Sequence, residues 1–96
     1  QIGNDASALN DLAISLYESF QYDKDAMKDA EKFAKKAAEN GNEIDYYITY
    51  AYILKSNGKQ ELAMKSAEYA LELAGEDTTK KAKVHRSITK LKIWTV

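Results

Sequence analysis

Few side chains in this chain could carry out catalysis or bind a metal ion. His85 is the only histidine, cysteine is absent, and four scattered glycines form no phosphate-binding loop. Three carboxylates, Asp23, Asp25 and Asp29, cluster where a helix is expected to start. Capping of the free helix amides explains them more simply than calcium binding, because their spacing is not that of an EF-hand loop. We therefore expect no enzymatic activity, no metal site and no cofactor.

Tyrosines are the other side chains with polar chemistry. Tyr46, Tyr47, Tyr50 and Tyr52 fall on one predicted helix, and Tyr69 lies on the helix expected to pack across from it. Seven tyrosines against two phenylalanines indicate partly hydrated helix interfaces, where each hydroxyl finds a partner. Most of these rings are expected to be packing residues.

The composition is that of one small globular domain. The 96 residues are 45% hydrophobic and 30% charged. No apolar run approaches the length of a membrane span, and the first residues show neither a basic nor an apolar targeting region. The chain is thus expected to be soluble as given, with its compartment left open. Because the sequence does not begin with Met, we expect a processed product or a fragment of a longer chain.

Charge is distributed unevenly along the chain. Residues 1–77 contain 8 lysines and 15 acidic residues, whereas residues 78–96 contain six basic residues and no acid. This basic end could contact an acidic partner or phosphate. The simpler interpretation is the solvated face of a last helix, which partly neutralises an acidic body.

The sequence predicts helices throughout, because proline is absent and helix-forming residues dominate between short Gly and Asn breaks. Helices are expected at about 6–19, from 23 or 25 to 41, 43–57, 60–74 and from 78 towards Trp94. Asn40-Gly41 and Asn57-Gly58 are predicted helix stops. The residues expected on the buried faces are, in chain order, Leu9, Leu12, Ala13, Leu16, Tyr17, Ala26, Ala30, Phe33, Ala34, Ala37, Tyr47, Tyr50, Ala51, Leu54, Ala63, Ala67, Ala70, Leu71, Ala82, Val84, Ile88 and Leu91.

An internal repeat is the strongest signal. The segment 26–31 returns 37 residues later as segment 63–68, with five of six positions identical. A period of this length is typical of a helix-turn-helix unit that buries its apolar face by stacking on a copy of itself. Ala51 and Ala63 are small because two helices are expected to cross there.

Helices three and four resemble one tetratricopeptide repeat, a unit of about 34 residues. The residues that carry the resemblance are Tyr47, Tyr50, Ala51, Leu54, Gly58, Ala63, Ala67 and Ala70. Shifted back by 37 residues, the same register selects Asn10, Ala13, Ile14, Tyr17, Ala26, Ala30 and Phe33. Shifted forward by 34 residues, it selects Val84, His85 and Ile88.

The resemblance implies an all-α domain over residues 1–96, built from antiparallel helix-turn-helix repeats in a right-handed superhelix of about five helices. Repeat 1 would span about 7–40, repeat 2 about 44–77, and a capping helix or truncated third repeat about 78–94. The family implies a non-catalytic scaffold that binds a protein or peptide on a concave face. In this register that face holds Asp11, Leu12, Ser15, Ile48, Thr49, Tyr52, Lys55, Lys83 and Arg86.

Within this face, Ile48 and Tyr52 are the predicted apolar anchor, and Lys55, Lys83 and Arg86 are predicted to meet acidic groups. The family's clamp for acidic chaperone tails is not expected here. Asp11, Ser15, Thr49 and Thr79 occupy four of its five positions, and only Lys83 agrees in kind.

A second hypothesis is a structural repeat segment of a larger protein, an enzyme being one candidate, that packs against a domain outside this sequence. It predicts an exposed apolar strip along Ile88, Leu91 and Trp94, and homodimerisation of the isolated chain. Nucleic-acid binding ranks below both hypotheses, because six charges on one helix are a weak footprint and the acidic body would repel phosphate.

Overall fold

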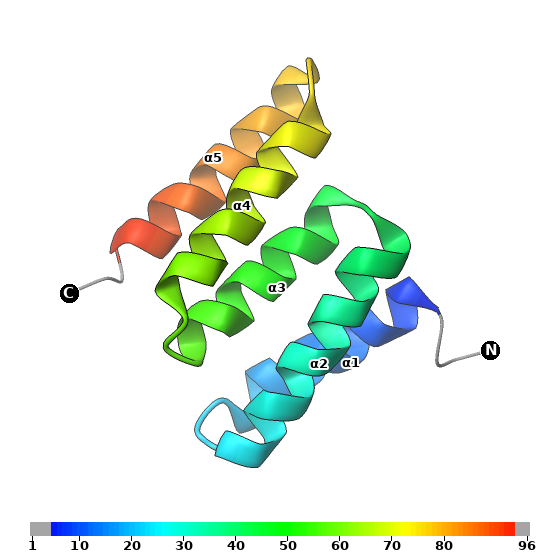
Figure 1. The fold of residues 1–96 in the computed structure, drawn as a ribbon, viewed down its shortest axis with the longest axis vertical. Coiled ribbons are helices and arrows are strands. Elements are labelled where there is room, and N and C mark those ends of the chain that lie inside the picture. Colours follow the sequence, from blue (N-terminus) through cyan, green and yellow to red (C-terminus); the bar gives the residue numbers. More distant parts are fainter. Residues whose placement is uncertain (1–4, 94–96) are drawn as a thin grey trace.

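The computed structural model describes residues 5–93, which form five α-helices and no β-strand. The helices are α1 (Ala6–Phe20), α2 (Lys24–Gly41), α3 (Ile44–Ser56), α4 (Gln60–Ala74) and α5 (Thr78–Ile93) (Figure 1). The all-α prediction is confirmed, and the predicted helices match the observed ones in number and order. Trp94 lies outside the described residues.

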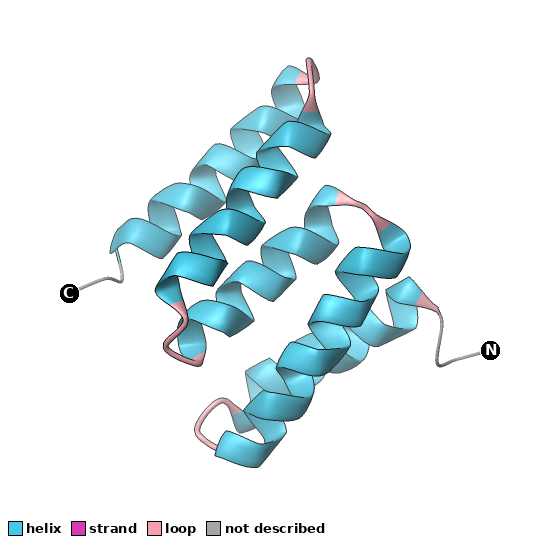
Figure 2. Ribbon diagram, in the orientation of Figure 1, coloured by secondary structure: helices cyan, strands magenta, loops and turns pink. Residues whose placement is uncertain are grey.

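The helices form two layers. Each helix packs against the next one along the chain, most extensively α1 with α2 and α3 with α4, and α3 also contacts α1 and α5. Figure 1 shows α2 and α4 in front of α1, α3 and α5, and Figure 2 shows that only short loops join the helices. The molecule is 38 by 36 Å across and 18 Å thick, which is the thickness of two packed helices.

Carboxylates begin three of the helices. The side chain of Asp5 accepts a hydrogen bond from Ala8 N (3.1 Å), and Asp23 accepts from Asp25 N (3.0 Å) and Ala26 N (3.1 Å). Asp77 accepts from Lys80 N (3.0 Å) at the start of α5. These bonds satisfy amides that have no partner inside the helix. The structure thus supports capping as the role of Asp23.

The helix α2 ends at Gly41 as predicted, but the residue that terminates it is Asn42. Asn42 takes the left-handed conformation (φ 51°) and donates its backbone N–H to Ala38 O (2.9 Å), while Gly41 remains in α2. A Cβ on Gly41 would lie 2.8 Å from Ala6 Cβ and overlap the Tyr46 ring. Gly41 is therefore needed for close packing of α2 against the starts of α1 and α3, and Asn42 ends the helix.

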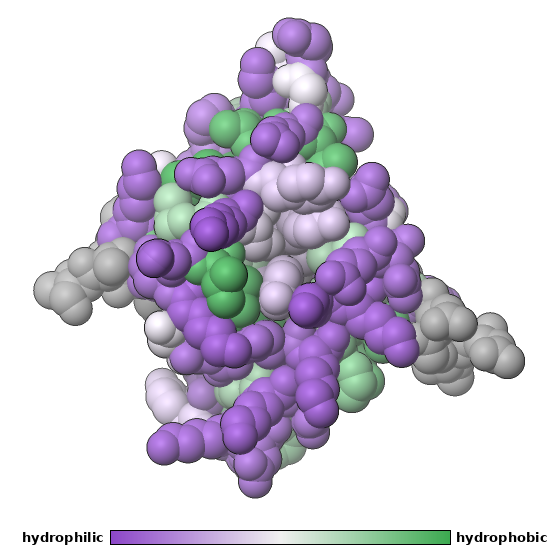
Figure 3. Space-filling model, viewed as in Figure 1, coloured by the Kyte–Doolittle hydropathy of each residue, from purple (hydrophilic) through white to green (hydrophobic). Residues whose placement is uncertain are grey.

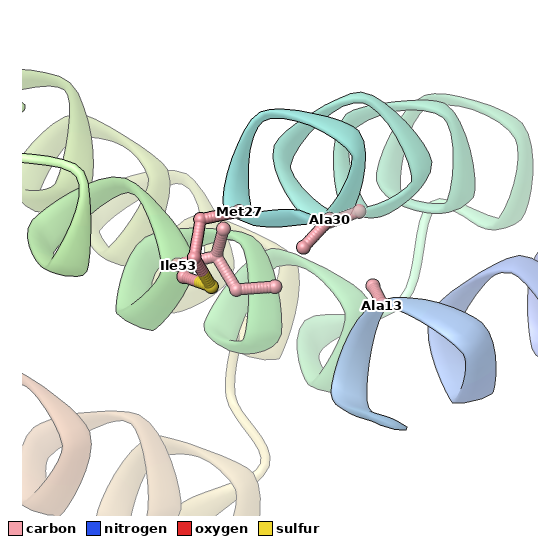
Figure 4. Close-up of a cluster of buried hydrophobic side chains, with 5 residues drawn as sticks. Ala13, Met27, Ala30 and Ile53 are labelled. Atoms are coloured by element: carbon pink, nitrogen blue, oxygen red, sulfur yellow. The ribbon is translucent and has the colours of Figure 1, made fainter. Parts of the chain in front are cut away.

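Small residues line the helix crossings. One buried cluster joins α1, α2 and α3 through Ala13, Met27, Ala30, Ala34 and Ile53 (Figure 4). A second cluster joins α3, α4 and α5 through Ala51, Leu54, Ala63, Ala67 and Leu91. All six alanines in these clusters are fully buried, so the backbones approach closely at each crossing. The prediction for Ala51 and Ala63 is confirmed.

The predicted buried faces need four corrections. Leu12 is 44% exposed and Ala82 is exposed, whereas Met27 and Ile53, absent from the predicted faces, are almost fully buried. Periodicity finds one stripe per helix, but α3 contacts four other helices and buries more than one side. Ile53 packs towards α1 and α2, and Leu54 packs towards α4 and α5.

The apolar side of α5 is covered. Val84 and Leu91 are fully buried. Ile88 is half-buried and packs against two clusters, one around Leu54 and one around Val84, each of which contains residues of α3 and α4. The exposed strip expected along Ile88 and Leu91 is therefore wrong for these two residues, and its third member, Trp94, is not described. The outward side of α5 carries exposed polar side chains such as His85, Thr89 and Lys92.

One polar network ties the two helical hairpins together. Asn57, in the α3–α4 loop, donates its side-chain amide to Met27 O (3.1 Å) and to Glu31 Oε1 (2.9 Å) on α2. Lys59 Nζ lies 2.7 Å from Glu31 Oε2. Burial opposes ionisation of Glu31, but the Asn57 amide and the Lys59 ammonium outweigh it and lower the pKa of this carboxyl below 4.5.

Asn57→Ala is expected to lower the free energy of unfolding by about 1–3 kcal/mol, because it leaves the Met27 carbonyl and the Glu31 carboxylate short of a donor. Since the folded pKa of Glu31 is the lower one, its contribution is complete above the unfolded pKa of 4.5 and is lost as pH falls through the folded value. Urea unfolding at pH 7 and pH 3 should show that the difference in free energy of unfolding between the wild type and Asn57→Ala is smaller at pH 3. Asn40→Ala, at an exposed asparagine, is the control. If the stability lost by Asn57→Ala is the same at both pH values, the loss comes from the hydrogen bond to the Met27 carbonyl alone.

Candidate functional site

A trough runs between α1 and α3 on the layer that contains α1, α3 and α5. Its cavity volume is about 430 Å³, within the usual range for ligand-binding clefts. Isoleucine side chains from both helices make much of its wall, with polar groups between them. The lining residues are Asn10, Ile14, Tyr17, Glu18, Asp45, Ile48, Thr49, Tyr52 and Ile53.

The trough continues at both ends. Tyr17 and Tyr52 also line a hollow of about 300 Å³ between the ends of α1, α3 and α5, together with Gln21, Lys55, Ser56 and Lys90. Asp45 also lines a third hollow, of about 360 Å³, near the starts of α3 and α5. The other residues of that hollow are Asn42, Glu43, Ile44, Leu73, Thr79, Lys80, Lys83 and Arg86. The trough shares Tyr17 and Tyr52 with one hollow and Asp45 with the other, and the three neighbouring hollows are together called here the α1/α3/α5 groove.

The predicted apolar anchor is only partly accessible. Tyr52 is half-buried, lines two of the three hollows, and packs against the clusters around Leu54 and Val84. Ile48 is 8% exposed, so it belongs to the trough wall and to the core rather than projecting as an anchor. Burial against Ala70 and Val84 is the physical reason.

The predicted basic residues lie at opposite ends of the groove. Lys55 lines the hollow at the end of α3, where its Nζ donates to Gln60 Oε1 (3.4 Å). Lys83 and Arg86 line the hollow at the other end, where Lys83 forms a salt bridge with Asp45. The structure thus brings together Lys83 and Arg86 but separates them from Lys55. Lys90, which was not among the predicted site residues, accompanies Lys55 instead.

The face predicted for the first helix is rotated. Asp11, Leu12 and Ser15 are exposed and line none of the three hollows, whereas Asn10 and Ile14 do. The reason is register. Asn10, Ala13 and Ile14 match Ile48, Ala51 and Tyr52 in burial or in lining the trough, which makes the offset between the first helices of the two hairpins 38 residues rather than 37.

The same shift applies to Tyr17, which was expected on a buried face. Tyr17 packs on the first cluster and also lines the groove. One residue of offset turns a helix face by about 100°. Pairing the buried alanines Ala13 and Ala51, rather than extending the 37-residue period, would have found the correct face from the sequence.

Asn10, Glu18 and Asp45 are polar residues of the trough that were not among the predicted site residues, and only Asn10 is buried. It is 8% exposed, and its side-chain Oδ1 is fully buried without a hydrogen-bond partner. Most buried polar atoms in folded proteins have such a partner. In the sequence, Asn10 was selected only as a position of the repeat register.

The tyrosines of α3 other than Tyr52 are structural. The Tyr47 and Tyr69 rings lie 4.7 Å apart between centroids, and Ser66 Oγ donates to Tyr47 O (2.8 Å). Burial raises the pKa of Tyr47, with Tyr69 and Glu39 adding to it, and burial also raises the pKa of Tyr50. Both phenols are therefore neutral packing groups at physiological pH.

The face opposite the groove is formed by α2 and α4. Figure 3 shows it as mainly hydrophilic, with a paler area between the two helices. Within residues 5–93, no group of three or more His, Asp or Glu side chains is arranged to hold a metal ion, and His85 is exposed on α5. No helix in this range is both long and apolar enough to cross a bilayer.

No protein-family model, curated protein or solved structure matches this chain. The groove and its side chains are therefore the observations on which a function can be argued.

Proposed function

We propose that this chain is a non-catalytic scaffold module of tetratricopeptide type that binds a protein segment in the α1/α3/α5 groove. The observation that carries the proposal is the trough between α1 and α3 together with the adjoining hollow that shares Tyr17 and Tyr52 with it. Residues 45–56 of α3 extend over about 17 Å at 1.5 Å per residue, which is the length of about five extended residues. A groove of this length suits a peptide better than a compact small molecule.

The lining chemistry supports the same proposal. Tyr17, Tyr52 and Ile14 provide amphipathic and apolar contact surface, while lysines and carboxylates stand at the ends. Aromatic side chains in partly desolvated pockets supply much of the energy in peptide recognition. By contrast, no histidine or cysteine among the described residues lines the groove.

Thr49→Arg is expected to weaken peptide binding about tenfold or more, because the long side chain would fill the trough. Thr49 is half-buried, and its Oγ1 bonds only to Asp45 O within the same helix (3.0 Å), so the fold should tolerate the change. Binding of pooled pentapeptides is measured by amide chemical-shift titration. Glu68→Arg, exposed on α4, is the matched control. Equal binding by both variants, or shifts confined to α2 and α4, would contradict the proposal. Tyr52→Ala is a poorer test, since Tyr52 also packs on two core clusters.

A second candidate is a structural segment that docks within a larger assembly or onto a second copy. Exposed apolar side chains at the first hairpin favour it: Leu12 is 44%, Phe20 53% and Tyr22 94% exposed. Light scattering across a concentration series tests this role. A dimer that Leu12→Glu dissociates would support it, and a monomer at every concentration would count against self-association.

A further inference from the structure

Two asparagines of this chain are followed directly by glycine. Asn40 precedes Gly41 at the end of α2, and Asn57 precedes Gly58 in the α3–α4 loop. An asparagine in this position can deamidate without an enzyme, because glycine has no side chain to hinder attack by its backbone nitrogen. The sequence alone makes the two pairs equivalent, but the structure distinguishes them.

The reaction begins when the backbone nitrogen of the glycine attacks Cγ of the asparagine side chain. A bond forms between these two atoms, the bond from Cγ to Nδ2 breaks, and the side-chain nitrogen leaves as ammonia with the backbone proton. One water molecule then opens the five-membered succinimide at either of its carbonyls and leaves aspartate or isoaspartate. Water is therefore the only reactant that the chain does not supply.

The fold holds the Asn57–Gly58 pair away from this reaction in three ways. The Asn57 side-chain nitrogen donates to Met27 O (3.1 Å) and to Glu31 Oε1 (2.9 Å), which fixes Cγ beside α2. The Gly58 backbone N–H donates to Lys55 O (2.9 Å), so the attacking nitrogen keeps its proton. The ψ of 9° at Asn57 turns the Gly58 nitrogen towards the Asn57 nitrogen, whereas ring closure needs it beside Cβ.

The Asn40–Gly41 pair is held by a different part of the fold. Asn40 is exposed and lies in the last turn of α2, so the helical backbone restrains it. Fraying of that turn releases it. Asn57 is released only when its bonds to Met27 and Glu31 on the first hairpin break. The two sites therefore respond to two separate motions.

We infer that Asn57 is a deamidation site that reacts only when the two helical hairpins separate, and that its product keeps them apart. The product has no side-chain N–H to donate to Met27 O, and it places a carboxylate where the amide met the Glu31 carboxylate. Two negative charges at this distance repel each other. Isoaspartate also adds a carbon to the main chain of the loop. Deamidation at Asn57 is thus a covalent record of hairpin separation.

Peptide mass spectrometry after incubation of the full 96-residue chain in mildly alkaline buffer measures the two sites separately. Asn57 should deamidate about tenfold or more slowly in the native protein than in urea, since only the open fraction reacts. Glu31→Ala removes one of the two acceptors, so it should speed the reaction at Asn57 several-fold and leave the Asn40 rate unchanged. Glu31→Gln keeps an acceptor oxygen and should restore most of the protection.

Glu68→Ala, at an exposed glutamate on α4, is the matched control and should change neither rate. If Asn57 reacts as fast in the native protein as in urea, the fold does not protect it and the inference is wrong. It is also wrong if Glu31→Ala speeds both sites alike, because global unfolding rather than hairpin separation would then control Asn57.

The effect of the product is tested by Asn57→Asp, compared with Asn57→Ala. At pH 7 the carboxylate variant should have a folding equilibrium constant lower by a further factor of about five, or a melting temperature lower by about 4–8 °C. At pH 3 this difference should narrow, since protonation removes the repulsion from Glu31. Equal stability of the two variants at pH 7 would show that the product does not keep the hairpins apart.

Discussion

Leu91→Ala is expected to lower the free energy of unfolding by about 2–5 kcal/mol. Leu91 is fully buried and packs with Leu54 and three alanines of α3 and α4, so the deleted methyl groups leave a cavity that rigid alanine-lined helices cannot fill. A domain of this size has about 5–15 kcal/mol of stability in total. Loss of one leucine should therefore remove a large part of it.

Chemical denaturation followed by far-ultraviolet circular dichroism measures this effect. Leu62→Ala removes the same atoms from a side chain that is 49% exposed on α4, and should cost much less. If both variants lose similar stability, or if Leu91→Ala unfolds in two steps with α5 first, then α5 does not close the array as an integral part of the core.

Ala63→Leu is expected to destabilise the fold by about 1–3 kcal/mol through overpacking. Ala63 is fully buried where α4 crosses α3, against Ala51 and Leu54. Three additional carbons can be accommodated only if the helices move apart, which would also loosen Leu91 on α5. The melting temperature measures this loss.

The internal repeat supplies the control for Ala63→Leu. Ala26 is its counterpart 37 residues earlier, but the first hairpin leaves Ala26 only half-buried. Ala26→Leu should therefore cost little. Equal effects at Ala26 and Ala63 would mean that burial at the crossing is not what requires the small residue.

Helix positions were predictable because their causes are local. Asp23 and Asp77 cap the helices that follow them, and positive φ at Gly58 and Gly75 ends the helices before them. Each signal depends on residues within about one helical turn. Gly41 shows the limit: α2 ends there as predicted, but its lack of a side chain serves a contact with Ala6 and Tyr46, which no local pattern reveals.

The candidate site was predictable only in part. The layer that carries it follows from the repeat pattern, and Tyr52, Lys55, Lys83 and Arg86 do line the groove. Which side of α1 faces the groove depends on how Ala13 packs against Ala30 and Ala34. A difference of one residue in the offset between the two hairpins turns a different side of α1 towards the groove.

By itself the sequence determined the all-α class, the order of five helices and the small residues at their crossings, because capping, periodicity and residue size act over short distances along the chain. Only the tertiary structure decided that Lys55 joins Lys90 rather than Lys83, that α5 buries Leu91, and that Asn10 Oδ1 has no partner. These features arise where separate helices meet, and the helix-to-helix rotation that sets them is a property of packing rather than of any one segment.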